Sequence, residues 1–287
     1  MDERPGSRLR DPLIATGVGA CVLAAGAGLD DQVLSWLKSR KMRKYMGKQD
    51  ELAVVAAGRA LGNAKVDLQD GSRIGVYLCV GYIPFERADI DAITAGSLRD
   101  GQFSMEQFST VGVDQVNPLL TFRCLPNMPA FHVSLNFGLR GPYFVTYPGI
   151  GQFYLALEAA ASALCSGEVD CALVGGVADQ RNFLVEYHFS RLPQRTALAR
   201  HDAAAVVCLE TRAHAADRRA PRRAELIDFD IQYQPHDPLV APPEQFDDDA
   251  LGPAALGCAL HDATGEELVH AARTRDGFRA QSRWSVA

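Results

Sequence analysis

The chain has 287 residues, 47% of them hydrophobic, and a formal net charge of −6. This length suits one substantial domain, or a large domain with a smaller appendage. The mild acidity argues against a general nucleic-acid binder. Apolar runs that alternate with helical stretches, together with 25 glycines, favour an α/β class over an all-β or disordered chain.

The N-terminus and the cysteines indicate a reduced, cytoplasmic protein. The first 12 residues, MDERPGSRLRDP, are polar and charged and form a flexible leader rather than a signal sequence. The apolar stretches fall short of the ~20 residues that a membrane span requires, so we expect no membrane span. The 7 cysteines include no CxxC pair and no zinc-type spacing with histidine, which favours buried reduced thiols and no metal site.

The first half of the chain begins with a buried strand and a Gly-rich turn over 13–26, LIATGVGACVLAAG. Its GVG lacks the third glycine and the later acidic residue of a dinucleotide-binding loop, so we discount that function. A basic segment follows at 38–48. The apolar spacing of 49–64 predicts a helix that stops at Gly62-Asn63. The continuous apolar run 73–81 predicts a strand buried on both faces.

The middle of the chain is expected to be loop-like over 82–112 and to form short helical pieces, broken by prolines, over 117–141. A strand over 143–147 then leads into the sharp turn PGIG. The helix predicted over 151–165 is apolar nearly all round and ends at Gly167. The apolar run 170–176, DCALVGG, then predicts another fully buried strand. A helix without a polar stripe lies in an interior layer, so we expect sheet on both sides of it and five layers, αβαβα.

Further strands are predicted at 203–210 and 224–233, with an Arg-rich helix or loop between them. The tail continues with a proline-rich and acidic loop, whose acid run 244–249 we interpret as solvated. The tail closes with a hairpin over 267–286 that turns at Asp276-Gly277.

The stretch 141–176, GPYFVTYPGIGQFYLALEAAASALCSGEVDCALVGG, resembles the nucleophile region of the β-ketoacyl synthases, which have the thiolase fold. Other segments from 13 to 235 are similar to that family in the same order. The resemblance implies a complete N-terminal half at 13–222 and a strongly shortened C-terminal part at 223–287. The residues of 141–176 that stand in register with the family are Gly141, Pro142, Gly167, Glu168, Asp170, Ala172, Gly175 and Gly176.

One departure from the family decides the expected activity. The position of the family's cysteine nucleophile falls on Ile150, which has neither thiolate nor lone pair. Cys165 lies 15 residues along the helix, ~22 Å away at ~1.5 Å per residue, and Cys124 is interpreted as a buried core thiol. The family's two histidine motifs are also incomplete. We therefore expect no catalytic residue and no enzyme activity from this chain by itself.

In this family, a cysteine-less subunit that pairs with an active ketosynthase is a chain-length factor. The resemblance therefore implies a heterodimer or heterotetramer with a full-length ketosynthase in bacterial type II polyketide biosynthesis, of an aryl polyene for example, or a fatty-acid-like pathway. It implies no cofactor, because acyl chains arrive on the phosphopantetheine of an acyl carrier protein. The expected tunnel-lining or plugging residues are Tyr147, Ile150, Gln152, Phe153 and Tyr154. The expected dimer strand consists of Tyr143, Phe144, Val145, Thr146 and Tyr147.

Two basic clusters could bind an acidic carrier protein, although a solvated helix face is the more ordinary reason for such charge runs. The candidates are Lys41, Arg43, Lys44, Arg218, Arg219, Arg222 and Arg223. His132 and His188 are interpreted as hydrogen-bonded core residues. A half-built fold should also expose apolar sheet surface and so depend on a partner.

Two other functions stay open at this point. The chain could be an acyltransferase or thioesterase with a relocated nucleophile, or a subunit that only stabilises an assembly. Covalent labelling by an acyl thioester would indicate the first, and substitutions that change complex yield without changing product length would indicate the second.

Overall fold

The computed structural model describes residues 9, 11–24, 27–191, 200–233, 250–274 and 277–287. Most of the expected leader and the acid run 244–249 therefore lie outside the described residues. Within the described ranges, no helix combines the length and apolar composition needed to cross a bilayer.

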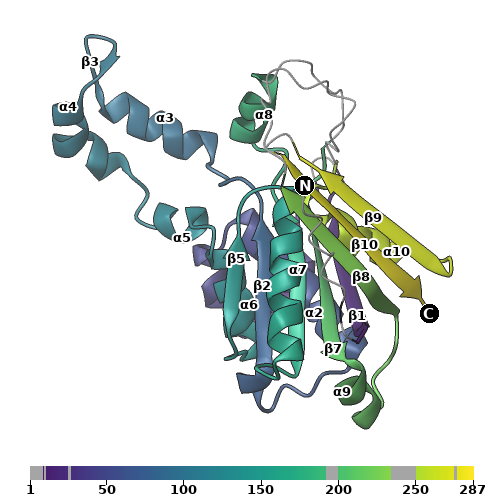
Figure 1. Cartoon of the computed structure of the whole chain (residues 1–287). Coiled ribbons are helices and arrows are strands. Elements are labelled where there is room, and N and C mark those ends of the chain that lie inside the picture. Colours follow the sequence, from purple (N-terminus) through teal and green to yellow (C-terminus); the bar gives the residue numbers. More distant parts are fainter. Residues whose placement is uncertain (1–8, 10, 25–26, 192–199, 234–249, 275–276) are drawn as a thin grey trace.

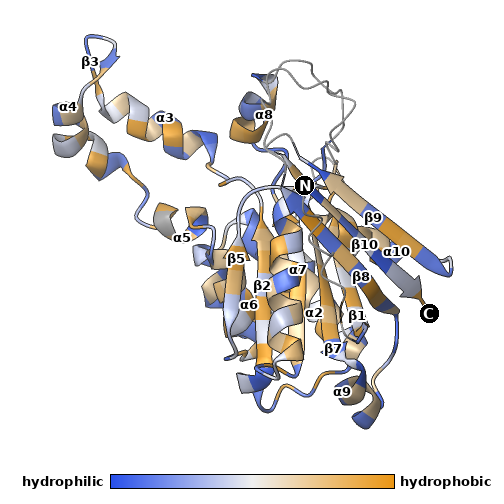
Figure 2. Ribbon diagram, in the orientation of Figure 1, coloured by the Kyte–Doolittle hydropathy of each residue, from blue (hydrophilic) through white to orange (hydrophobic). Residues whose placement is uncertain are grey.

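An eight-stranded sheet organises the described chain (Figure 1). β5 and β6 run parallel to β2, and the other neighbouring strands are antiparallel. β2 and β6 are apolar runs buried along their whole length (Figure 2), which is why their sequences alone predict strands. In spatial order the strands are β5 (Tyr143–Thr146), β2 (Ile74–Val80), β6 (Cys171–Ala178), β7 (Ala203–Thr211), β1 (Leu13–Val22), β8 (Ala224–Tyr233), β10 (Phe278–Val286) and β9 (Glu267–Arg273).

Helix α7 (Ile150–Cys165) lies inside this sheet, as its apolar surface predicts. It packs against β2 and β6 on one side and against β9 and β10 on the other. The sheet can pass around the helix because β8 pairs with β1 over only three residues, from Leu13 to Ala15, and then leaves it. Helices α2 (Lys48–Ala64) and α6 (Met128–Phe137) cover the outer face of the first part of the sheet.

The layered α/β fold is thus confirmed, and four of the five expected layers are present among the described residues. The described layers are α2 with α6, the β5-to-β1 strands, α7 with α10 (Ala255–Asp262), and the β8–β10–β9 strands. On β10 the burial alternates strictly from Phe278 to Trp284, so the face away from α7 is exposed.

The exposed face of β10 is polar, which corrects the expectation that the fold leaves an apolar sheet surface uncovered. Its side chains on β10 are Arg279, Gln281 and Arg283, which lie beside Gln232, Asp230 and Asp228 of β8. A polar face of this kind is stable in water without a covering layer. This polar face therefore gives no reason by itself to need a partner.

The glycines of the GVG in β1 serve packing, not a phosphate loop. A Cβ on Gly17 would collide with the Ala60 carbonyl of α2, and a Cβ on Gly19 with the Ala56 carbonyl. The two glycines therefore let α2 lie directly on the strand.

The loop expected over 82–112 is wrong, because much of that segment is helical. It contains α3 (Arg87–Gly96), the two-stranded β3 (Leu98–Arg99) and β4 (Gln102–Phe103), α4 (Met105–Thr110) and the 3₁₀ turn η3 (Gly112–Gln115). The helix predicted over 49–64 is confirmed as α2, although Gly62-Asn63 does not end it. The helix continues to Ala64, where Lys65 closes it with a φ of 52°.

The remaining helices are short connectors around this framework, and the expected boundary at 222/223 falls between α9 and β8. The tail hairpin is confirmed as β9 and β10, while α10 and η5 were not anticipated from the sequence. The connectors are α1 (Asp30–Leu34), η1 (Arg40–Tyr45), η2 (Gly71–Arg73), α5 (Leu120–Cys124), α8 (Phe183–Ser190), α9 (Arg212–Asp217) and η5 (Gly252–Ala254).

Candidate functional site

The candidate site is the sharp turn, or elbow, between β5 and α7. Gly149 has a φ of 109°, a conformation that only glycine adopts without strain, and Ile150 is the first residue of the helix. The Thr146 hydroxyl donates to the carbonyl of Gln152 over 2.8 Å and fixes the strand end to the first helical turn. The turn thus presents the side chain of residue 150 at a defined place.

The elbow of this protein is closed by its own tail. Ile150 is only 8% exposed and belongs to the same apolar cluster as Phe278. A Cβ placed on Gly151 would lie 3.0 Å from both the Phe278 ring and the Thr274 methyl group. The C-terminal hairpin therefore occupies the space over the turn, and an isoleucine at its apex fits that apolar surrounding.

A thiol does lie beneath the elbow, on the neighbouring strand. The Cys79 Sγ is 3.2 Å from the carbonyl oxygen of Gly149. Burial raises the pKa of this thiol to about 12, although contacts with Thr146 and Gly149 act in the opposite direction. A neutral, fully buried thiol is not a nucleophile. Sequence analysis missed Cys79 because 70 residues separate it from Gly149, and only the pairing of β2 with β5 brings them together.

The five candidate tunnel residues do not form one lining. Tyr147 is exposed, with its ring edge-to-face to that of Tyr82, and Gln152 is half-buried. Phe153 and Tyr154 face the buried cluster inside the protein. On this geometry Ile150 and Phe153 fill the core beneath the elbow, while Tyr147 stands at the surface.

Tyr154 fastens the hairpin to α7 through a buried polar network. Its hydroxyl lies 2.8 Å from His270 Nδ1, 2.9 Å from the His270 carbonyl and 3.1 Å from Ser282 Oγ. Trp284 Nε1 donates to Ser282 Oγ over 2.9 Å. If His270 carries its proton on Nδ1, every group is satisfied, because the Tyr154 oxygen accepts from His270 and Ser282 and donates to the carbonyl. The network is structural, and it supplies no activated nucleophile.

The candidate dimer strand β5 is the edge of the sheet, with no strand on its outer side among the described residues. Tyr143 is 63% exposed and Phe144 is 44% exposed, whereas Val145 is half-buried and Thr146 is buried. An edge strand with free backbone groups and exposed aromatic rings is a template for pairing with another chain.

The two basic clusters differ from the expectation that each is one open patch. In the first cluster, on η1, Lys41 and Lys44 are exposed, but Arg43 pairs with Glu51 over 2.8 Å. In the second cluster, Arg218 pairs with Glu210 and Arg222 with Glu225. Among the described residues, Arg219 and Arg223 are exposed with no ion pair of their own. Part of the predicted binding charge is therefore used inside the fold.

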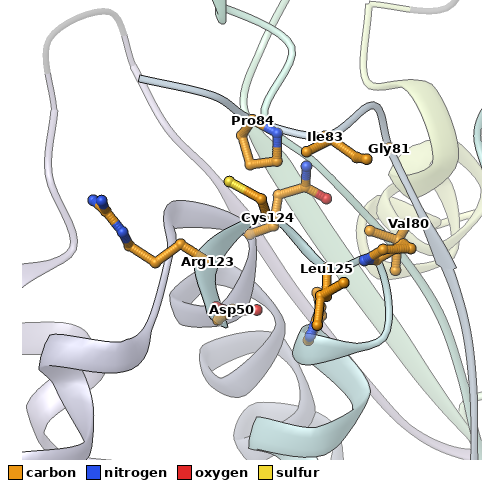
Figure 3. A pocket seen from close by; sticks show the side chains of 11 residues that line it. Asp50, Val80, Gly81, Ile83, Pro84, Arg123, Cys124 and Leu125 are labelled. Atoms are coloured by element: carbon orange, nitrogen blue, oxygen red, sulfur yellow. The ribbon is translucent and has the colours of Figure 1, made fainter. Parts of the chain in front are cut away.

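Neither of the two alternative cysteines is activated. Cys165 is exposed at the end of α7, the far end from the elbow. Cys124 is only half-buried, and it lines a small pocket where α5 meets the N-terminus of α2 and the end of β2 (Figure 3). Burial raises the pKa of this thiol to about 11. In the same pocket Gln49 donates to the Tyr82 carbonyl over 2.7 Å, but its own side-chain oxygen accepts no hydrogen bond.

The structure brings together Cys171, Cys208 and Glu210, a combination that sequence spacing did not reveal. The two Sγ atoms are 3.0 Å apart on adjacent strands. Both oxygens of Glu210 are already engaged by Arg218, and they also contact Thr16 and His214. Burial acts to raise the pKa of Glu210, but these hydrogen bonds hold it below its ordinary value. The cluster is better explained as a buried ion pair than as a metal donor set.

The structure differs from the prediction that His132 and His188 are both hydrogen-bonded core residues. His132 is fully buried, but neither ring nitrogen has a hydrogen-bond partner of good geometry. Burial lowers its pKa to about 4, and the nearby Tyr45 backbone opposes this only weakly. His188 is hydrogen-bonded, to the Tyr82 hydroxyl over 3.0 Å, but it is exposed on α8.

The fold and the elbow together define a ketosynthase-type thiolase fold in which the apex of the turn is an apolar, covered side chain. The model of the beta-ketoacyl synthase N-terminal domain matches residues 15–206. The chain belongs to the β-ketoacyl synthase family.

Two curated proteins that this chain resembles are distant from it in sequence. A 3-oxoacyl-[acyl-carrier-protein] synthase 2 of Staphylococcus aureus strain N315 is 24% identical over 139 residues, which cover 48% of this chain and 30% of that protein. The aligned part thus spans less than a third of the relative's length. The same enzyme of strain COL is 23% identical over an equal stretch.

Solved structures confirm the thiolase-like ketosynthase fold over nearly the whole chain. A type II polyketide synthase acyl-carrier protein in complex with its ketosynthase matches with a TM-score of 0.70 at 15% identity, and it covers 97% of this chain and 100% of the matched chain. The ishigamide ketosynthase/chain length factor matches with a TM-score of 0.69 at 15% identity, and it covers 96% and 99%. At this identity the likeness concerns the fold alone.

Proposed function

We propose that this chain is a non-catalytic, chain-length-factor-like subunit that pairs with an active ketosynthase. The observation that carries the proposal is the closed elbow. Ile150 stands where the family places its nucleophile, and Phe278 and Thr274 cover the turn. Cys79, the thiol beneath the turn, is buried and has a pKa of about 12. Acyl transfer needs a nucleophile that is both ionisable and reachable, and this elbow supplies neither.

The pairing is supported by the composition of β5. Its outer edge is unpaired in the described structure, and it carries the exposed rings of Tyr143 and Phe144. If β5 pairs antiparallel with the same strand of a ketosynthase, Tyr147 follows directly at the surface between the two chains. Tyr147 is therefore the candidate tunnel residue best placed to limit the growing acyl chain, because Phe153 and Tyr154 are inside the core.

The closed elbow also favours one second candidate, a subunit that only stabilises the assembly. At the elbow of the described structure, Ile150 and Phe153 are buried in the apolar cluster, so an effect on chain length would come from surface residues. The two functions differ in one consequence, since only the first makes product length depend on Tyr147.

The test is co-expression with a full-length ketosynthase, an acyl carrier protein and the substrates. The proposal requires stoichiometric co-purification and a longer product from the Tyr147→Ala complex. Tyr233→Ala is the control, because Tyr233 is also an exposed tyrosine, 64% against 40% for Tyr147, but lies at the end of β8. A changed complex yield at constant product length would indicate the stabilising subunit. A monodisperse monomer that turns over substrate would contradict both functions.

A further inference from the structure

Strand β9 is an open edge of the sheet, at the other end of the strand order from β5 (Figure 1). In that order, β7, β6, β2 and β5 lie on one side of the β1–β8 pair, and β10 and β9 lie on the other. Among the described residues, the second side therefore ends two strands earlier than the first. The place beside β9 is where a further strand would continue the sheet.

β9 lacks the bulge, the proline and the central charge that commonly block an open edge. It pairs with β10 in unbroken register along all seven residues. The inner residues of the strand, LVHAA, include no proline and no Lys, Arg, Asp or Glu. Val269 in the middle of this run is 52% exposed. A regular, uncharged edge of this kind is a template for another strand.

The backbone groups that β9 offers to a further strand belong to its odd-numbered residues. The Thr274 amide donates to the Phe278 carbonyl over 2.9 Å, and the Val286 amide donates to the Glu266 carbonyl over 2.9 Å. Hydrogen-bonded pairs alternate along antiparallel strands, so the even-numbered residues of β9 direct their amides and carbonyls at β10. The odd-numbered residues direct theirs outward, and their side chains share one exposed face. These residues are Glu267, Val269, Ala271 and Arg273.

The two ends of β9 carry opposite charges on this exposed face. Arg273 lies directly opposite Arg279 of β10, which is also exposed. Like charges at directly opposed positions destabilise an antiparallel pair. Glu267 lies at the far end of the strand, opposite Ser285. A further strand that placed a carboxylate beside Arg273 would offset the repulsion between the two arginines.

A second copy of β9 supplies that carboxylate. If two copies run antiparallel with His270 on the two-fold axis, Glu267 of each copy lies opposite Arg273 of the other, and Val269 lies opposite Ala271. These are the residues whose backbone groups point outward, so amides meet carbonyls along the whole edge. A shift by two residues in either direction keeps the backbone match but separates the opposite charges. The sequence ELVHAAR is thus complementary to itself in one register.

We infer that β9 is a self-association edge, at which two copies of this chain pair antiparallel about His270. An edge of seven residues buries less than the about 800 Å² per partner of a standard interface, so the association is weak. The contact is isologous and closes as a two-fold dimer. β9 is not the strand proposed for pairing with a ketosynthase, so the inference does not rest on that pairing. Where both contacts form, the assembly contains two copies of this chain and two ketosynthases.

The experiment measures dimerisation of the full chain by sedimentation equilibrium at low salt, with charge-swapped variants of β9. Glu267→Arg and Arg273→Glu should each raise the dissociation constant about 10-fold, because each one sets like charges opposite each other at both ends of the pair. The double variant restores opposite charges in exchanged positions and should regain the original dissociation constant. Arg223→Glu is the control, because it makes the same change of charge at an exposed residue before β8.

Amide hydrogen exchange gives a second measurement on the unchanged chain. At concentrations where the chain dimerises, the outward amides of Val269 and Ala271 should gain protection. The amides of His270 and Ala272 are directed at β10 and should be protected at every concentration. The thermal midpoint of each variant shows whether the chain itself remains folded.

The other outcomes overturn the inference and are distinguishable from failure of the proposed function. A chain that stays monomeric, in a complex with one copy of each subunit, removes the self-association and leaves the proposed function intact. Dimerisation that the single variants do not change, without new protection of β9, assigns the contact to another surface. A folded double variant that does not regain affinity refutes the register. Normal dimerisation of this chain without any ketosynthase complex removes the proposed function and leaves the inference.

Discussion

The Phe278 side chain lies so close to Gly151 that a Cβ on this glycine would come within 3.0 Å of the ring. The two residues are 127 positions apart, and one belongs to the elbow helix while the other begins the last strand. Their contact joins the tail hairpin to the turn that carries Ile150. A thiolase-type elbow is thus retained in this chain, but the protein's own C-terminal strand covers it.

The first prediction tests whether the C-terminal strand covers the elbow. Gly151→Ala should destabilise the protein by about 1–3 kcal/mol, because the added methyl group overpacks the contact with Phe278 and Thr274. Gly62→Ala is the control, since Gly62 is also helical but its nearest neighbour, in Trp36, is 4.0 Å away. That substitution should be neutral or stabilising by up to about 1 kcal/mol. Urea unfolding of both variants is the measurement, and equal midpoints would show that the elbow is not covered.

The second prediction concerns restoration of the sulfur. Ile150→Cys should not create a condensing enzyme, because the new thiol would lie in the same covered, apolar surrounding, which raises thiol pKa values. Its alkylation by iodoacetamide in the native protein should be slower than that of the exposed Cys165. Peptide mapping after a timed reaction gives both rates. An acylated peptide containing position 150 after incubation with an acyl thioester would refute this view of the elbow.

The third prediction is a pH dependence of stability that arises from His132. Its pKa is 6.5 when unfolded and about 4 in the fold, where burial disfavours the charged ring. Above pH 6.5 the ring is neutral in both the folded and the unfolded state, so protonation of His132 takes nothing from the free energy of unfolding. As the pH falls from 6.5 to about 4, only the unfolded chain gains the proton, so the free energy of unfolding decreases by about 1.4 kcal/mol per pH unit.

His132→Gln removes this proton uptake and should flatten the decline. The comparison with the variant is needed because Asp179 acts in the opposite direction. Burial raises the pKa of Asp179 from 3.8 to about 6, which favours the fold as the pH falls through that interval. Urea unfolding of both proteins between pH 7 and 4.5 gives the difference. Parallel pH curves would show that His132 is not held neutral in the fold.

The fourth prediction separates binding charge from structural charge in the second basic cluster. Arg219→Glu and Arg223→Glu should weaken binding of an acyl carrier protein at low salt and leave the thermal midpoint unchanged, because both side chains are exposed. Arg218→Met should instead cost about 3–5 kcal/mol of stability, since it leaves the buried carboxylate of Glu210 without its main partner. If Arg219→Glu and Arg223→Glu both bind the carrier protein with unchanged affinity, the second basic cluster is only solvated surface charge.

Most of the framework was predictable because it consists of buried strands and one buried helix. The apolar runs of β2 and β6 and the nearly all-apolar surface of α7 indicate burial on most sides, which leaves little choice of architecture. The helices within 87–110 were missed because they are short. α3 has ten residues and α4 has six, and neither buries a residue, so a short apolar pattern was not enough to predict them.

The site was predictable only in part. Counting from Gly141-Pro142 located Ile150 at the apex of the turn, but nothing local indicated that Phe278 covers it or that Cys79 lies beneath it. Both are contacts between distant segments, created by strand pairing and by the curl of the sheet around α7. The ion pairs of Arg218 and Arg222 join residues only eight and three positions apart, and they were missed because the sequence did not show that Glu210 and Glu225 are buried on strands.

The intact mass of the purified chain after incubation with an acyl thioester, with no other protein present, tests the absence of a nucleophile most directly. We predict an unchanged mass, with acylation appearing only on an active ketosynthase when that protein is added. A stoichiometric acyl adduct on this chain alone would contradict the account.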